Sequence, residues 1–135
     1  MPIDRYLVPL GRALCVGIFL FGAPGHFTPA YAQYGAQAGV PIPQILVPLS
    51  GILMLAGGLS VLLGYRAKLG AWLLVLFLVP VTLTMHTFWA ESDPMMAQMQ
   101  MAMFMKNVSI LGGALLLAHF GAGPVSLDAR ARAAA

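Results

Sequence analysis

The sequence predicts an all-α protein, a bundle of four transmembrane helices. Of its 135 residues, 60% are hydrophobic and only 8% are charged, whereas soluble domains have roughly 25% charged residues. The mean hydropathy is +0.87, and the apolar residues gather into four runs, each near the length of about 20 residues that crosses a bilayer. We therefore expect a single membrane domain, residues 1–135, surrounded by lipid.

The first helix is expected at residues 5–23, around an apolar run from about Leu7 to Phe21 that Arg12 alone interrupts. Pro24 and Gly25 then end it. A cleaved signal peptide is the alternative interpretation, because a basic start, a short apolar core and AYA at residues 30–32 resemble a cleavage site. We favour a retained helix.

Residues 28–44 contain two tyrosines and neither an acid nor a base, and are expected to form an interfacial loop with a short helix. The second helix is expected at residues 44–64. Small residues let helix backbones approach closely, although glycine is also simply common in membrane helices. The residues assigned to helix packing are Gly51, Gly57, Gly58, Gly112 and Gly113.

The third helix is expected at residues 69–90, with Pro80 inside it as a kink. Asp93 and Pro94 are typical of a helix start, with Asp93 as N-cap and Pro94 at the first helical position. The fourth helix is therefore expected at residues 94–120. The tail, residues 121–135, is expected to be frayed.

Four spans place both termini on one side of the membrane, and the basic residues indicate which side. Of the seven lysines and arginines, six fall on the terminal side and Lys106 falls on the other. The six are Arg5, Arg12, Arg66, Lys68, Arg130 and Arg132. By the positive-inside rule both termini are expected in the cytoplasm, for a multi-pass protein of a bacterial inner membrane.

Polar groups gather on the side opposite the termini. A span of about 20 residues that ends near Phe120 must begin near Gln100, which places Lys106 roughly 9 Å below that surface. An ionisable residue inside a span indicates a functional site. We therefore expect a ligand pocket there, and its candidate residues are His26, His86, Trp89, Glu91, Lys106 and Asn107.

Helical spacing shows which of these side chains share a face. Gln100, Phe104 and Asn107 form one stripe of the fourth helix, and Lys106 lies on the neighbouring stripe. In the third helix Thr82, His86 and Trp89 stand at i, i+4 and i+7. The alternative to a pocket is that Lys106 snorkels to Glu91 or to lipid phosphate, and that His86 is an interfacial residue.

No metal site is expected. Alternate methionines from Met99 to Met105 offer soft ligands for Cu(I), but alternate residues of a helix point about 200° apart, so apolar packing is the better interpretation. No motif encodes a cofactor, and contact with a quinone, haem or pigment would come through a partner. Cys15 is the single cysteine, which excludes an internal disulfide, and the scattered basic residues form no nucleic-acid patch.

Several segments carry a family resemblance: GRALCVGIFLFGAPGHF in the first helix, LAGGLSVLLGYRAKLGAW across the second and third, HTFW, and QMAMFMKNVSILGGALLL in the fourth. Together they resemble the DoxX family of small four-helix membrane proteins. Many members carry a glutamate before the Gly-Gly of the second helix, where residues 52–55 here read ILML. His86, Trp89, Lys106 and Asn107 match motif positions, but the resemblance assigns them no catalytic role, and the catalytic residues are unknown.

The resemblance implies a membrane subunit or anchor of a redox-related complex. In this interpretation the pocket binds a small anionic or quinone-like ligand, with Lys106 supplying charge and His86 a proton or hydrogen bond. The alternative is a purely structural accessory subunit that packs against a larger membrane assembly containing pigment or haem. Other membrane subunits are expected as partners in both cases, and a stand-alone enzyme is not expected because the chain has no cofactor fingerprint and no redox cysteine pair.

Overall fold

Four long helices make up the computed structural model, which describes residues 3–135 and contains no strand in that range. They are α1 (Asp4–Gly22), α3 (Pro43–Leu63), α4 (Ala67–Met85) and α5 (Pro94–Phe120). Each coincides closely with one of four segments that are long and apolar enough to cross a membrane. The predicted all-α, four-span architecture is therefore confirmed.

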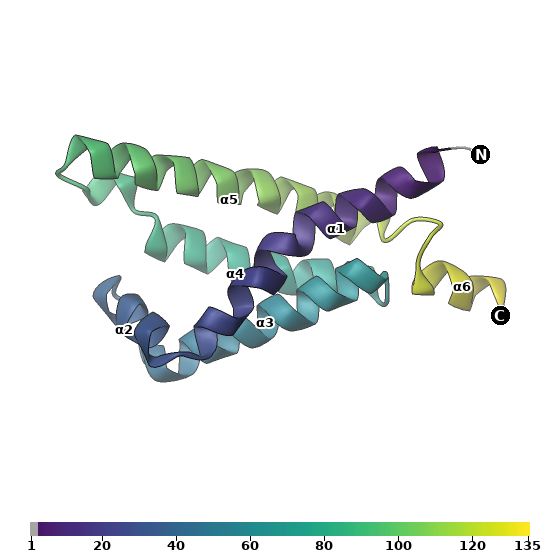
Figure 1. Ribbon diagram of the computed structural model, residues 1–135, viewed down its shortest axis with the longest axis horizontal. Helices are drawn as coiled ribbons and strands as arrows, with labels where there is room; N and C mark the ends of the chain where they lie inside the picture. Colours follow the sequence, from purple (N-terminus) through teal and green to yellow (C-terminus); the bar gives the residue numbers. More distant parts are fainter. Residues whose placement is uncertain (1–2) are drawn as a thin grey trace.

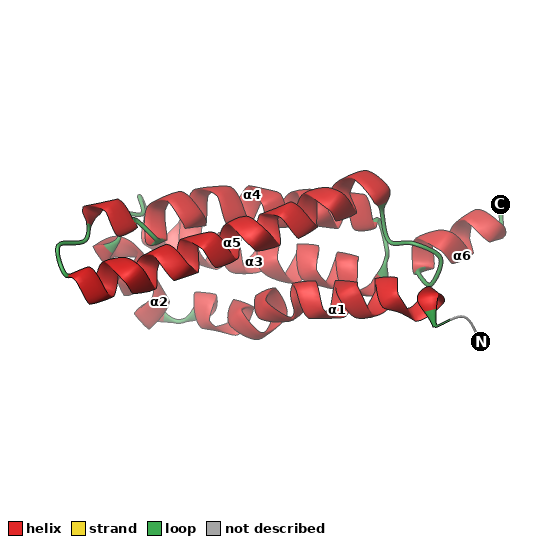
Figure 2. Cartoon of the chain, turned by 90° about the horizontal axis from the view of Figure 1, so that it is seen from above, coloured by secondary structure: helices red, strands yellow, loops and turns green. Residues whose placement is uncertain are grey.

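Short helices connect or extend the spans. They are η1 (Ala23–Phe27), α2 (Pro29–Gln37), η2 (Phe88–Ala90) and α6 (Leu127–Ala133). The two ends of the chain lie at the same end of the bundle (Figures 1 and 2). We call this the proximal end and the opposite one the distal end. Which side of the membrane each end faces stays a prediction.

The spans follow one another in space in the order α1, α3, α4, α5, each packed on the next. Glycine permits the closest approaches of α3: a Cβ on Gly57 would lie 2.8 Å from the carbonyl oxygen of Gly70, and one on Gly58 would lie 2.8 Å from Leu20. A Cβ on Gly51 would meet His26 at 2.8 Å. Consecutive residues of a helix point about 100° apart, so these contacts bring α1 and α4 against adjacent faces of α3.

The two glycines of α5 behave differently from those of α3. A Cβ on Gly113 would lie 3.6 Å from the Cys15 sulfur, an ordinary contact, and no described atom lies within 4 Å of a Cβ on Gly112. Gly112 therefore differs from its expected packing role, because its face of α5 is turned away from the other helices.

The end of α4 also differs from the expectation. The helix ends at Met85 rather than near residue 90, and His86 has a non-helical backbone, with φ −124° and ψ 53°. The turn of η2 that follows places the Phe88 ring 5.4 Å from the Phe104 ring of α5. This aromatic contact directs the chain toward α5 before Asp93 caps that helix by accepting a hydrogen bond from the Met95 amide at 3.1 Å.

The tail, which was expected to be frayed, is folded onto the proximal end. Ser126 caps α6 by accepting a hydrogen bond from the Ala129 amide at 3.1 Å. The Asp128 carboxylate accepts hydrogen bonds from the amides of Arg66, at 2.7 Å, and Ala67, at 3.0 Å. Asp128 thus caps the start of α4, and it holds Arg66 at a positive φ of 48°.

Arg12 joins the first helix to the same tail. The residue is 4% exposed, and its guanidinium donates hydrogen bonds to the carbonyl oxygens of Ala122 and Val125, the latter at 2.7 Å. Gly64, in the turn between α3 and α4, has a φ of +65°, and a Cβ there would clash with Ser126. The tail therefore closes the proximal end by contacting α1 and the α3–α4 turn together.

Candidate functional site

A cavity of about 740 Å³ occupies the distal half of the bundle. Figure 1 shows α3 and α4 moving apart toward that end. The cavity is lined by residues of both helices and also of α1, η1, α2 and α5. We call it the distal cavity.

Four of the six candidate pocket residues line the distal cavity: His26, His86, Lys106 and Asn107. They come from three segments of the chain, namely η1, the end of α4, and two adjacent positions of α5. Trp89 and Glu91 do not line it. Trp89 is 59% exposed and its ring packs on Phe104 at 5.9 Å, because the break at His86 ends the helical spacing on which its placement depended.

His26 is held in a defined orientation. Its Nδ1 lies 2.7 Å from the Ser50 hydroxyl oxygen, and that hydroxyl donates its proton to the Val47 carbonyl at 2.6 Å. Since a serine hydroxyl has one proton, Nδ1 of His26 must be the donor. In the neutral ring, Nε2 is then left as a hydrogen-bond acceptor.

His86 has the same arrangement at the distal end of α4. Its Nδ1 lies 2.9 Å from Oε1 of Gln100, an oxygen that can only accept, so Nδ1 donates and Nε2 of the neutral ring is an acceptor. The two histidines therefore contribute two acceptor nitrogens.

Asn107 links α5 to α4 through a buried hydrogen bond. Its Nδ2 donates to the Thr82 hydroxyl at 3.1 Å, and the two side chains are only 7% and 6% exposed. The predicted stripe of Gln100, Phe104 and Asn107 therefore faces α4 and η2, which fixes the rotation of α5. That rotation brings the neighbouring residue Lys106 to the cavity.

Lys106 provides the positive charge of the cavity. Its Nζ donates a weak hydrogen bond to the Met103 sulfur at 3.6 Å. No aspartate or glutamate among residues 3–135 lines the cavity. The charge of Lys106 is therefore not balanced by an acid in the distal cavity.

The polar groups lie at three depths along the helices. Depth is measured from His86, at the distal end, toward the proximal end. At 1.5 Å per residue, Thr82 and its partner Asn107 lie about 6 Å deeper than His86. The His26 ring lies 5.9 Å from the Phe77 ring, and Phe77 is about 14 Å below His86 on the same scale. The deepest polar group is thus the His26–Ser50 pair.

The sequence alone did not indicate several residues of the site. Ser50 and Gln100 orient the two histidines, and Tyr31 lines the cavity with its ring 5.2 Å from His26. The sequence offers one signal for Ser50 and Gln100: a serine or glutamine within a membrane span needs a hydrogen-bond partner there. The partner itself depends on the register between helices.

No group of three His, Cys, Asp or Glu side chains within residues 3–135 is close enough to hold a metal ion. His119, the third histidine, lies at the proximal end of α5 with its ring against Phe120 at 4.7 Å. It is therefore remote from the distal cavity.

Comparisons with known proteins place the chain among small membrane proteins. The model of the SURF4 family matches residues 41–133. The chain is 34% identical over 124 residues to inner membrane protein YqjF of Escherichia coli (90% of this chain, 88% of that protein) and 30% identical over 126 residues to inner membrane protein YphA of the same organism (92% and 89%).

A more distant match is the ER-derived vesicles protein ERV29 of Saccharomyces cerevisiae, which is 30% identical over 77 residues, covering 57% of this chain and 24% of that protein. No solved structure matches the chain.

These findings correct the family expected from the sequence. The resemblance to DoxX was wrong, because the family model that matches is that of SURF4, and it covers three of the four segments on which the resemblance rested. Glycine-rich apolar helices joined by short basic turns satisfy the same packing rules in many small membrane bundles, so such segments discriminate poorly between families. The redox role that the resemblance implied therefore loses its basis.

Proposed function

We propose that this chain, which belongs to the SURF4 family, is a membrane-embedded binding protein whose distal cavity holds a small anionic or quinone-like ligand. It is a multi-pass inner membrane protein, as its four spans and its relatives in Escherichia coli show. The proposal concerns what the distal cavity does in that membrane.

The convergence of His26, His86, Lys106 and Asn107 on one cavity is the observation that carries this proposal. Ionisable residues within spans are costly and mark binding sites or pathways. A volume of about 740 Å³ lies within the range of roughly 300–1,000 Å³ that is usual for ligand sites. Size and polar content therefore both suit a small molecule.

The hydrogen-bonding groups define the chemistry of that molecule. Lys106 donates to an anionic oxygen or a quinone carbonyl, and its charge favours the anion. The Nε2 atoms of the two histidines accept from a hydroxyl or another donor of the ligand. Asn107 is largely committed to Thr82 and positions Lys106.

We also propose that the protein binds other membrane subunits. The spans containing α1 and α5 have the smallest buried shares, 22% and 17%, compared with 33% for each of the other two. Their outward faces are thus the surfaces most available to a partner. If the protein were only an accessory subunit, partner binding would persist when the cavity is altered.

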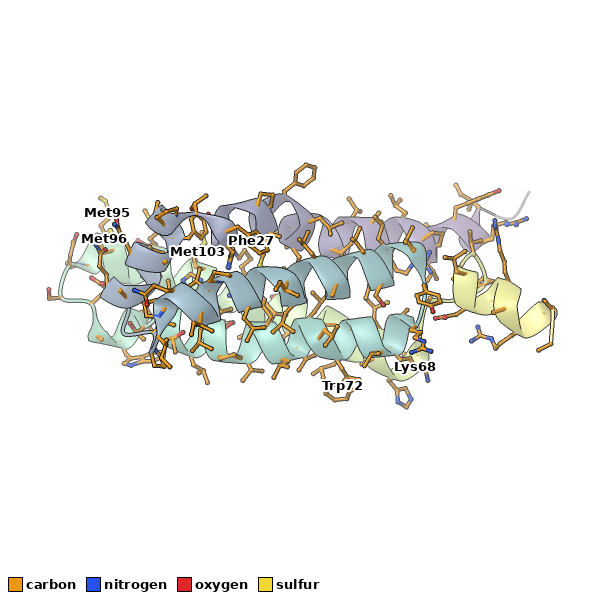
Figure 3. All side chains as sticks on the ribbon, turned by 90° about the horizontal axis from the view of Figure 1, so that it is seen from below. Phe27, Lys68, Trp72, Met95, Met96 and Met103 are labelled. Carbon is orange, nitrogen blue, oxygen red and sulfur yellow. The ribbon has the colours of Figure 1, made fainter. Side chains whose placement is uncertain are left out.

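The test compares small molecules that co-purify with the protein in native-membrane nanodiscs. We expect mass spectrometry of the extract to find a molecule with the wild type that is absent from Lys106→Met. Lys68→Met is the matched control, since Lys68 lies at the proximal end of α4 (Figure 3). The same molecular content in all three proteins would contradict a ligand site at Lys106.

A further inference from the structure

The charge, shape and surroundings of the distal cavity narrow the class of its ligand. We infer that the occupant is an anionic amphiphile with a single apolar chain, which reaches the cavity from the bilayer. This inference rests on the proposed function, and it identifies the kind of molecule that the site binds.

Charge complementarity requires an anion rather than a neutral molecule. Lys106 is the one lysine or arginine among the cavity-lining residues, and no acid of the described chain lines the cavity with it. The Lys106 side chain is exposed, and the hydrogen bond that its ammonium makes to the described residues goes to the Met103 sulfur, which is a weak acceptor. An anionic headgroup would supply the strong, charge-assisted hydrogen bond that the protein itself does not provide.

The rest of the lining requires an apolar chain. Below the level of Lys106 the walls are mostly hydrocarbon. The His26–Ser50 pair at that depth is joined through Nδ1 of His26 and leaves Nε2 as an acceptor. The apolar lining residues include Ile18, Phe19, Leu53, Met54, Leu76 and Ile110. A polar solute would leave this surface unmatched, whereas an alkyl or isoprenoid chain would cover it.

The dimensions favour one chain over two. From Leu76 to His86 the cavity follows α4 for about 15 Å, which is half of a hydrocarbon core of roughly 30 Å. A volume of about 740 Å³ holds about 25 heavy atoms if each takes about 30 Å³, the share of a water molecule. A headgroup with one chain, standing in one leaflet, fits that space, and a phospholipid with two long chains does not.

The cavity is open to the lipid. Several of its lining residues are also exposed, among them Leu46 at 38%, Leu49 at 46% and Leu76 at 59%. They lie on α3 and α4, the helices that diverge toward the distal end (Figure 1). A molecule dissolved in the leaflet can therefore enter between these helices without crossing water.

Photocrosslinking with a palmitate that carries a diazirine on its chain tests the inference, using the full-length protein in nanodiscs. We expect crosslinks on Leu53, Leu76 or Ile110 that unlabelled palmitate removes. Hexadecanol has the chain without the charge and butyrate has the charge without the chain, so neither should compete at equal concentration.

The role of the charge is tested in parallel variants. Lys106→Met should reduce crosslinking at least about tenfold, the effect of losing one charge-assisted hydrogen bond. Lys106→Arg keeps the charge and should retain most of the signal, as should Lys68→Met at the other end of the bundle. The melting temperature of each variant shows whether it folds. If Lys106→Met does not fold, the crosslinking of Lys106→Arg still tests the role of the charge.

The existence of a ligand site and its preference for an amphiphile are overturned by different results. If butyrate or a short-chain benzoquinone competes as well as palmitate in a Lys106-dependent manner, the cavity is a binding site but the amphiphile inference is wrong. If no probe reaches the cavity residues, or if Lys106→Met crosslinks like the wild type, the proposed function is wrong as well.

Discussion

Replacing Asp128 by alanine should release the C-terminal segment from the proximal end of α4. The Asp128 carboxylate accepts two backbone hydrogen bonds, from Arg66 at 2.7 Å and from Ala67 at 3.0 Å. A negative charge at this place also interacts favourably with the helix dipole of α4. Both contributions are lost with the side chain.

The size of the effect follows from these contacts. Loss of an N-cap acceptor costs about 0.5–2 kcal/mol. Ala67 is completely buried, so water cannot easily replace the acceptor, and we expect a value near the top of that range, about 2 kcal/mol. A change of that size raises the population of the detached tail about 30-fold.

Trypsin reports this population, because Arg130 and Arg132 lie in α6, beyond the cap. Cleavage that depends on local opening follows the open population, so Asp128→Ala should be cut at these sites about 30-fold faster than the wild type in nanodiscs. Asp128→Asn keeps one acceptor oxygen and should lie between the two.

Asp93→Ala is the matched control for this experiment. Asp93 is also an N-cap aspartate, but it caps α5 at the distal end, so its loss should leave cleavage of α6 unchanged. Equal cleavage of Asp128→Ala and the wild type would refute the assignment of Asp128 as the cap of α4, and so would equal acceleration by Asp93→Ala.

Three further predictions address packing, polar contacts and topology. Gly57→Ala would place a Cβ 2.8 Å from the Gly70 carbonyl oxygen, so we expect the free energy of unfolding in SDS to fall by about 1–3 kcal/mol. Gly112→Ala should leave it unchanged. Similar losses in both variants would contradict the helix order. Thr82→Val removes the hydrogen-bond acceptor of Asn107 and should lower the free energy of unfolding by about 0.6–1.7 kcal/mol in the same assay. If the two residues act as a unit, the double variant Thr82→Val/Asn107→Leu should show no further loss. A C-terminal fusion to green fluorescent protein should fluoresce and one to alkaline phosphatase should be inactive, as cytoplasmic termini require; the reverse pattern would show the opposite topology.

The spans could be predicted because their determinants are local. Hydrophobic length and proline at the first helical position define the starts of α3 and α5, at Pro43 and Pro94. The end of α4 could not be predicted in the same way. It depends on the contact between Phe88 and Phe104, two residues from different helical segments.

The distal cavity was predictable in part for the same reason. Depth along a helix is simple arithmetic, and it indicated that Lys106 and His86 lie near the same surface. Trp89 was included by extending the third helix past the point where it ends, and Glu91 because it follows that helix at the same surface. The pairing of His26 with Ser50 depends on the register of η1 against α3, which the sequence does not reveal.

The contacts of Arg12 set an order of events during synthesis. Its acceptor carbonyl at Ala122 lies 110 residues later in the chain, and at about 5–20 residues per second a ribosome needs roughly 5–20 s to reach it. Throughout that time α1 carries a guanidinium that has not met its final acceptors. The nascent bundle therefore cannot complete its proximal end until its last residues emerge, and a chain released before Ala122 would leave this arginine for quality control to detect.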